Sequence, residues 1–175
     1  MKKKLQFFTF TLLISVVTTH GQPAIKIFAW QQQSLPGTVP VGIKDENGNP
    51  IKKAAAITNY FIFLSFKKNY SIRPVQVFIK GSSFAVDTVI EVKKTPVQQT
   101  NLTVPNNPHT KILVPKTSNK VIRISPAEKT DSVEKSAHLK NLIKTNDVVV
   151  AYVWKEQRYF IAVKTIKELD PMFHE

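Results

Sequence analysis

One short stretch of the chain combines cations with an aromatic ring. Lys67, Lys68, Tyr70 and Arg73 fall within seven residues, and Trp154 stands beside a second turn further along the chain. Ammonium and guanidinium groups attract acidic groups, and the flat faces of tyrosine and tryptophan can stack on a sugar ring. We therefore predict that these five residues form a contact site for an anionic glycan or cell-surface polymer. The alternative is a solvated rim of charge at strand ends.

The residues that could catalyse a reaction do not form a motif. His109, His138 and His174 are the histidines that follow residue 21, and the chain has no cysteine and no Gly-x-Ser-x-Gly elbow. Asp87 and Glu91 share one face of a predicted strand, but residues four apart on a strand lie about 13 Å from each other, too far for a carboxylate dyad. We predict no catalytic residue, and a hydrolase with an unrecognised site stays open as a second alternative function.

Metal and cofactor ligands are equally sparse. Glu134 and His138 lie four residues apart on a predicted helix, a spacing that fits a surface contact as well as a ligand pair. Asp45, Asn47 and Asn49 echo the oxygen ligands of a calcium loop, but the glycine and glutamate of such a loop are not at the required positions. We predict no metal site and no cofactor.

The N-terminus has the order of a secretory signal. Lysines at positions 2–4 precede an apolar run over residues 5–17, and small residues at 19 and 21 precede a cut before Gln22. The alternative is an uncleaved N-terminal anchor, but the run is shorter than the roughly 20 residues of a transmembrane helix, which favours cleavage. We predict a secreted or periplasmic bacterial protein with no transmembrane segment after cleavage. That location argues against nucleic acid as a partner.

Composition bounds the rest of the chain. Without cysteine there is no disulfide and no lipid attachment site, so we predict that the protein is not a lipoprotein. Removal of residues 1–21 leaves 154 residues (175 minus 21), the size of one domain. It also leaves 22 basic residues (25 minus the three early lysines) against 12 acidic ones, a net charge of +10. We predict a single domain over residues 22–175 that favours anionic partners.

The apolar pattern has the period of β-strands. Residues 25–30 alternate, with Ile25, Ile27 and Ala29 on one face and Phe28 and Trp30 on the other. Residues 57–66 are rich in aromatic and branched residues without helical spacing, which indicates a strand buried on both faces. Residues 84–92 give the clearest half-buried strand. Further strands are predicted at 39–43, 75–79, 111–114, 120–125, 148–154 and 158–166, the last two joined at 155–157.

The remaining segments are predicted to be helical or irregular. One helix is expected over 131–145, with Asp131 as its N-cap and Glu134 completing a capping box. Residues 95–111 are polar and rich in proline, which predicts a long loop. Residues 167–175 are predicted to be a frayed tail.

Together these elements predict a mainly β fold with one short helix, an Ig-like or transthyretin-like β-sandwich. Residues Asp45 to Ile51 and the following Ala54 to Ile57 resemble the opening of carboxypeptidase-regulatory-like domains of secreted bacterial proteins. The resemblance covers about a dozen residues, and Lys53 stands where those domains usually have glycine. It implies a β-sandwich and no activity.

The function predicted first is a non-enzymatic binding or structural module that acts through protein–protein contacts. The exposed sheet edges of β-sandwiches can pair with a strand of a partner protein. We expect the partner to be an envelope or extracellular protein of unknown identity, and the 95–111 loop is a second predicted contact segment. Binding of an anionic glycan by the basic patch is the alternative.

Overall fold

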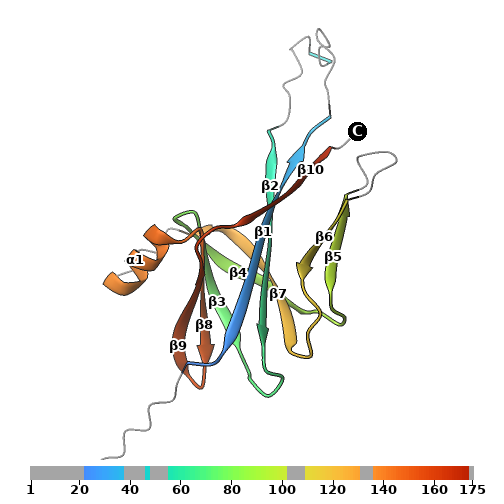
Figure 1. Ribbon diagram of the computed structural model, residues 1–175. Helices are drawn as coiled ribbons and strands as arrows, with labels where there is room; N and C mark the ends of the chain where they lie inside the picture. Colours follow the sequence, from blue (N-terminus) through green and yellow to red (C-terminus); the bar gives the residue numbers. More distant parts are fainter. Residues whose placement is uncertain (1–21, 38–45, 48–54, 102–108, 131–135, 174–175) are drawn as a thin grey trace, which may run out of the picture.

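The computed structural model describes residues 22–37, 46–47, 55–101, 109–130 and 136–173. This part of the chain is mainly β with one short helix, as predicted (Figure 1). Its elements in chain order are β1 (Ile25–Leu35), β2 (Ile57–Phe66), β3 (Arg73–Ile79), β4 (Ser82–Glu91), β5 (Val97–Asn101), β6 (His109–Val114), β7 (Lys120–Thr130), α1 (Ala137–Thr145), β8 (Val148–Trp154), β9 (Gln157–Val163) and β10 (Lys167–Phe173).

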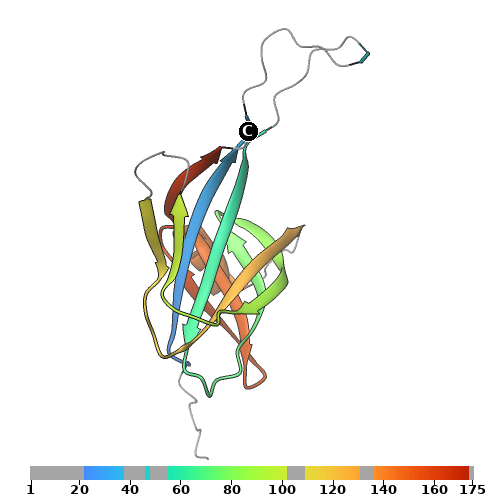
Figure 2. The ribbon, with the colours of Figure 1, turned by 90° about the vertical axis from the view of Figure 1, so that its right-hand side faces the viewer.

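Eight of the strands form one sheet in the order β10-β1-β2-β7-β4-β3-β8-β9, and β5 pairs with β6 in a separate hairpin. All pairs are antiparallel except β1 with β10. The large sheet curls strongly (Figure 2), and β1 comes beside β9 (Figure 1). The Gln22 side-chain amide spans this junction, donating to the Tyr152 hydroxyl of β8 at 3.1 Å and to the Phe160 carbonyl of β9 at 3.0 Å.

The concave face of the curled sheet holds the main core. Ala29, Ile62, Val77, Ile124 and Val150 are buried there, contributed by five different strands. Ile25 and Ile27 pack against the same core, whereas Phe28 and Trp30 belong to a second cluster. The predicted division of β1 into two faces is therefore confirmed.

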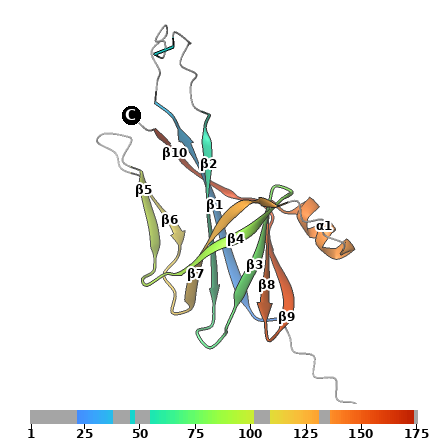
Figure 3. The same cartoon turned by 180° about the vertical axis from the view of Figure 1, so that it is seen from behind.

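The convex face is covered by two separate elements, which is why β2 and β8 are apolar on both sides. Residues of the β5–β6 hairpin, Leu113 and Val114, pack on Trp30 and Phe63. On the far side, α1 lies beside the sheet (Figure 3). Its Leu139 packs on Phe78 and Val149 and is fully buried. The prediction that residues 57–66 are buried on both faces holds for its second half, and Ile57 is exposed.

The Ig-like or transthyretin-like type of the prediction is not confirmed: eight of the described strands form one continuous, curled sheet. Register shifts between Phe84 and Val86 and between Val86 and Thr88 interrupt the β4–β7 ladder, and another lies between Pro74 and Gln76 on β3. Bulges bend strands and increase their twist. Such irregularities let one sheet curve around its own core.

Two segments predicted to be irregular form strands instead. The predicted 95–111 loop contains β5 and the start of β6, which pair from Asn101↔His109 to Val97↔Val114. The predicted frayed tail at 167–175 contains β10, which extends the sheet beside β1 and buries Leu169. Both strands are polar in sequence, so their pairing depends on partners that local composition does not reveal.

The helix and one strand also differ from expectation. The helix begins at Ala137, and Ser136 rather than Asp131 caps it, accepting from the Leu139 amide. The second half of β4 is exposed on both faces, with Val89 at 43% and Ile90 at 52% exposure, so the predicted half-burial of residues 84–92 holds only for residues 84–86 and for Val92.

Several predictions lie outside the described residues. These are the signal segment 1–21, the strand at 39–43, Asp131 with Glu134, and most of the 45–51 stretch that carries the family resemblance. Among the described residues, no helix has the length and apolar character needed to span a bilayer.

Candidate functional site

Four connections gather at one end of the curled sheet, which we call the loop end. They are residues 67–72 between β2 and β3, 92–96 between β4 and β5, 115–119 between β6 and β7, and 155–156 between β8 and β9 (Figure 1). Exposed lysines stand on all four, at positions 67, 68, 93, 94, 116 and 155. The loop end is therefore strongly basic, which favours an acidic ligand.

An aromatic ledge lies within the loop end, formed by Tyr70, Trp154 and Tyr159. The ring of Trp154 is tilted against Tyr70 at a centroid distance of 5.6 Å and against Tyr159 at 6.0 Å. All three rings are half-buried. Tyr159 also stacks on buried Tyr152 at 5.8 Å, which ties the ledge to the core. Such a rigid group of partly exposed rings can stack on a sugar face.

Two tight turns bring these rings together. Residues 67–70 close a turn in which the Tyr70 amide donates to the Lys67 carbonyl at 3.0 Å. Lys155 and Glu156 both have positive φ, 48° and 63°, as a two-residue turn between twisted strands requires. The ammonium of Lys155 lies over the Trp154 ring, 4.8 Å from its centroid. A cation thus stands directly on the ledge.

The structure brings some of the predicted site residues together and leaves others apart. Tyr70 and Trp154 are in contact, although 84 positions separate them. Arg73 begins β3 opposite Val153, so it lies one residue from Trp154 across the pairing. Lys67 is exposed in its turn. Lys68 lines a separate cavity at the loop end.

A polar cavity of about 350 Å³ lies at the loop end, and we call it the lysine depression. Its lining is Lys68, Glu91, Val92, Lys93, Thr95, Thr117, Ser118, Asn119 and Lys120. The Thr95 hydroxyl donates to the Thr117 carbonyl and accepts from the Thr117 amide, both at 3.1 Å. These bonds clamp two of the loops together and fix the walls of the depression.

A second, smaller hollow of about 200 Å³ adjoins the depression. It lies between the β2–β3 connection, the end of β4 and the start of β7. Phe66, Tyr70, Ser71, Ile72, Val89, Glu91, Lys120 and Ile122 line it. Glu91 and Lys120 belong to both cavities and form an ion pair of 2.8 Å between them.

Sequence reasoning missed most of the lysine depression. Neither Lys93 nor Lys120 is among the predicted site residues. Lys120 reaches the depression because β7 pairs with β4, which brings it beside Glu91. A pairing between strands some thirty residues apart cannot be read from spacing within one segment.

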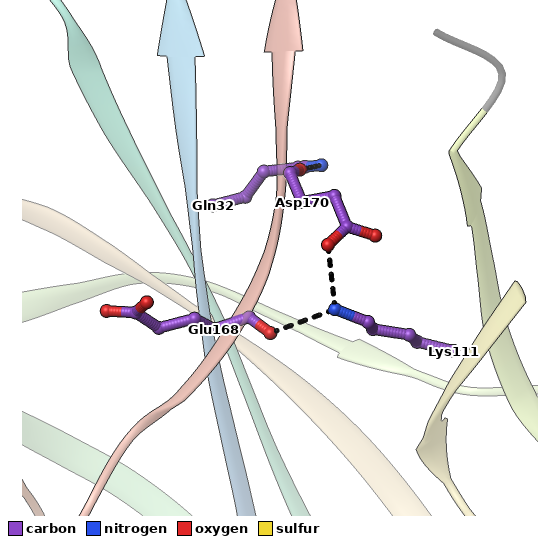
Figure 4. A network of polar contacts seen from close by, with 4 residues as sticks. All are labelled: Gln32, Lys111, Glu168 and Asp170. Carbon is purple, nitrogen blue, oxygen red and sulfur yellow. Dashed lines mark hydrogen bonds and ion pairs between the residues drawn. The ribbon is translucent and has the colours of Figure 1, made fainter. Parts of the chain in front are cut away.

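A second polar cluster lies at the opposite side of the sheet, where β10 and the β5–β6 hairpin meet (Figure 4). The Lys111 ammonium pairs with the Asp170 carboxylate at 3.0 Å, and the Gln32 amide donates to the Asp170 carbonyl at 2.8 Å. Gln32 in turn accepts from the Gln99 amide at 2.7 Å. The polar side chains of this cluster bond to one another, so they hold β1, β10 and the β5–β6 hairpin together.

The described residues offer little for catalysis or metal binding. They contain no group of three or more histidines, cysteines or carboxylates that could hold a metal ion. His138 is exposed on α1, where its ring meets the edge of Phe160 at 6.5 Å. Burial raises the pKa of Tyr152, which the Gln22 hydrogen bond partly offsets. That phenol stays protonated and packs as a core residue.

Comparison of this chain with models of known protein families, with curated proteins and with solved structures finds no match.

Proposed function

We propose that this chain is a non-enzymatic binding module that holds an acidic saccharide at its loop end. The observation that carries the proposal is the contact between Tyr70 and Trp154 within a ring of exposed lysines. The rings would stack on an uncharged sugar face, and the cations would attract its acidic substituents. The ledge and the depression share one end of the molecule, which suits an extended ligand.

Isothermal titration calorimetry with an acidic oligosaccharide tests this proposal. Trp154→Ala and Tyr70→Ala should each weaken binding by tenfold or more, because each removes one stacking surface. Phe173→Ala is the matched control, since Phe173 is an exposed ring at the far end of β10, with 62% exposure. Equal affinity in the wild type and both ledge variants would refute a saccharide site on the ledge.

Protein–protein contact is the second candidate, and a separate observation favours it. At the end of the sheet opposite the loop end, Ser34 of β1 pairs with Ile57 of β2 on one side and with Met172 of β10 on the other. Phe173 of β10 pairs with Leu35. Ile57, Met172 and Phe173 are all exposed, at 65%, 36% and 62%. Exposed apolar residues on an edge strand are a feature of partner-binding surfaces.

Chemical cross-linking of the purified protein in envelope extract separates the two candidates. An Ile57→Ser/Phe173→Ser variant should lose specific cross-linked products if the apolar end docks a partner, while Trp154→Ala keeps them. The reverse pattern would assign the partner to the loop end.

The predicted location and fold type accompany the proposal. Secretion or periplasmic export with a cut before Gln22 stays a prediction, which the intact mass of the exported protein tests. The Ig-like or transthyretin-like type also stays a prediction.

A further inference from the structure

The lysine depression carries a surplus of positive charge. Lys68, Lys93 and Lys120 line it together with one acid, Glu91, which leaves a net charge of +2. The Glu91 carboxylate is held by Lys120 at 2.8 Å. Within the described part of the chain, Lys68 and Lys93 have no ion-pair partner. Two ammonium groups therefore remain for an incoming anion.

The neutral lining adds hydrogen-bond capacity. Thr95 and Thr117 are already bonded to each other's loop, and the Asn119 side-chain amide donates to the Ser65 hydroxyl at 3.4 Å. The Ser118 hydroxyl makes no bond to any described residue, and it is exposed. It is a donor that an anion can take without breaking a native contact.

The charge available in the depression favours an anion with two negative charges. Arginine recognises both carboxylates and phosphates through a bidentate fork, whereas lysine attracts either group as a compact point charge. Among the described residues, the cations that line the depression are lysines. A phosphate monoester carries a charge between about −1.5 and −2 at neutral pH, which matches the two available ammonium groups.

The depression is continuous with the aromatic ledge. Glu91 and Lys120 line both the depression and the smaller hollow that adjoins it. Tyr70 also lines that hollow, and its ring centroid is 5.6 Å from that of Trp154. A ligand anchored in the depression can thus extend over Tyr70 towards Trp154. We propose that the lysine depression binds the phosphate monoester of a phosphorylated saccharide whose sugar rings lie along the ledge. This inference rests on the proposed saccharide-binding function.

Calorimetric titration of the full chain with four probes at constant ionic strength tests it: trehalose 6-phosphate, trehalose, glucuronic acid and inorganic phosphate. Trehalose 6-phosphate should bind at least tenfold more tightly than each of the other three, because only it engages both the depression and the ledge. Its affinity should fall as pH drops below about 6, where the phosphate loses its second charge.

Variants locate the anion. Lys68→Ala/Lys93→Ala should lower the affinity for trehalose 6-phosphate tenfold or more and leave that for trehalose unchanged. Lys140→Ala/Lys144→Ala, which removes two exposed lysines from α1, is the matched control and should change neither. A Lys68→Arg variant should retain binding, which shows that charge rather than folding is measured.

The failures of the two proposals are distinguishable. If trehalose and its phosphate bind equally and both depend on Trp154, the depression is not an anion site, although the saccharide function stands. Equal affinity for glucuronic acid overturns the choice of phosphate, and equal affinity for inorganic phosphate overturns the saccharide part. If no saccharide binds, both proposals are refuted.

Discussion

The two tryptophans of this chain have similar neighbours and opposite roles. Each lies under a lysine, Trp30 at 5.0 Å from the Lys167 ammonium and Trp154 at 4.8 Å from that of Lys155. Trp30 is 9% exposed, and its ring N–H donates to the Leu113 carbonyl at 3.0 Å. Trp154 is half-buried, and its ring N–H has no partner among the described residues.

The same difference separates the polar groups around the two rings. Near Trp30, the Lys111 and Gln32 side chains are satisfied by Asp170 and Gln99, so they join β1, β10 and the β5–β6 hairpin. Near the ledge, Lys68 and Lys93 lack such partners within the described chain. Side chains whose bonding capacity is filled stabilise the fold, and those whose capacity is free can bind a ligand.

The largest expected effect is on stability at Trp30. Trp30→Ala should lower the free energy of unfolding by about 3–5 kcal/mol, because it empties a buried site and leaves the Leu113 carbonyl unpaired. Trp154→Ala should cost less than about 2 kcal/mol, since it removes only half-buried ring contacts. Urea unfolding followed by circular dichroism measures both. Comparable losses at the two sites would erase the distinction.

Gln32 gives the next largest effect. It is 2% exposed, and Gln32→Ala leaves the Gln99 amide and the Asp170 carbonyl without their partner. We expect a loss of about 1–3 kcal/mol, the cost of orphaned polar groups. The control is Gln33→Ala on the same strand, where the side chain is exposed and the effect should be within about 0.5 kcal/mol.

Tyr152 predicts an alkaline limit to stability. Its pKa is raised by burial, so the folded state retains the proton more tightly than the unfolded state. Stability is therefore complete below the unfolded tyrosine pKa of about 10 and is lost as pH rises beyond it. At pH 7, Tyr152→Phe should lower the free energy of unfolding by about 0.5–1.5 kcal/mol, because the variant lacks the hydrogen bond from Gln22. Between pH 9 and 11, the free energy of unfolding of this variant should fall less than that of the wild type. Parallel declines would contradict this role.

The smallest effect concerns the Lys111–Asp170 ion pair. Its side chains are 38% and 43% exposed, so water screens the pair. Asp170→Asn should cost less than about 1 kcal/mol, and the difference should shrink at high salt. Thermal melts at low and high salt measure it. A larger, salt-independent loss would show that packing rather than charge holds β10 at this point.

Local pattern predicted the strands whose own side chains fill a core. The two faces of β1 and the apolar second half of β2 follow from alternation and composition. It failed for β5 and β10, because their stability comes from pairing with distant strands rather than from apolar content. The residues of the aromatic ledge were identifiable by type, but the contact of Tyr70 with Trp154 depends on how β3 pairs with β8.

The central claim is that the loop end, and not the region of Trp30, receives the saccharide. Fluorescence titration with trehalose 6-phosphate of two single-tryptophan variants, Trp30→Phe and Trp154→Phe, tests it most directly. The account predicts a saturable change in emission when Trp154 is the remaining tryptophan and none when Trp30 is. A change reported only by Trp30, or by neither ring, would contradict it.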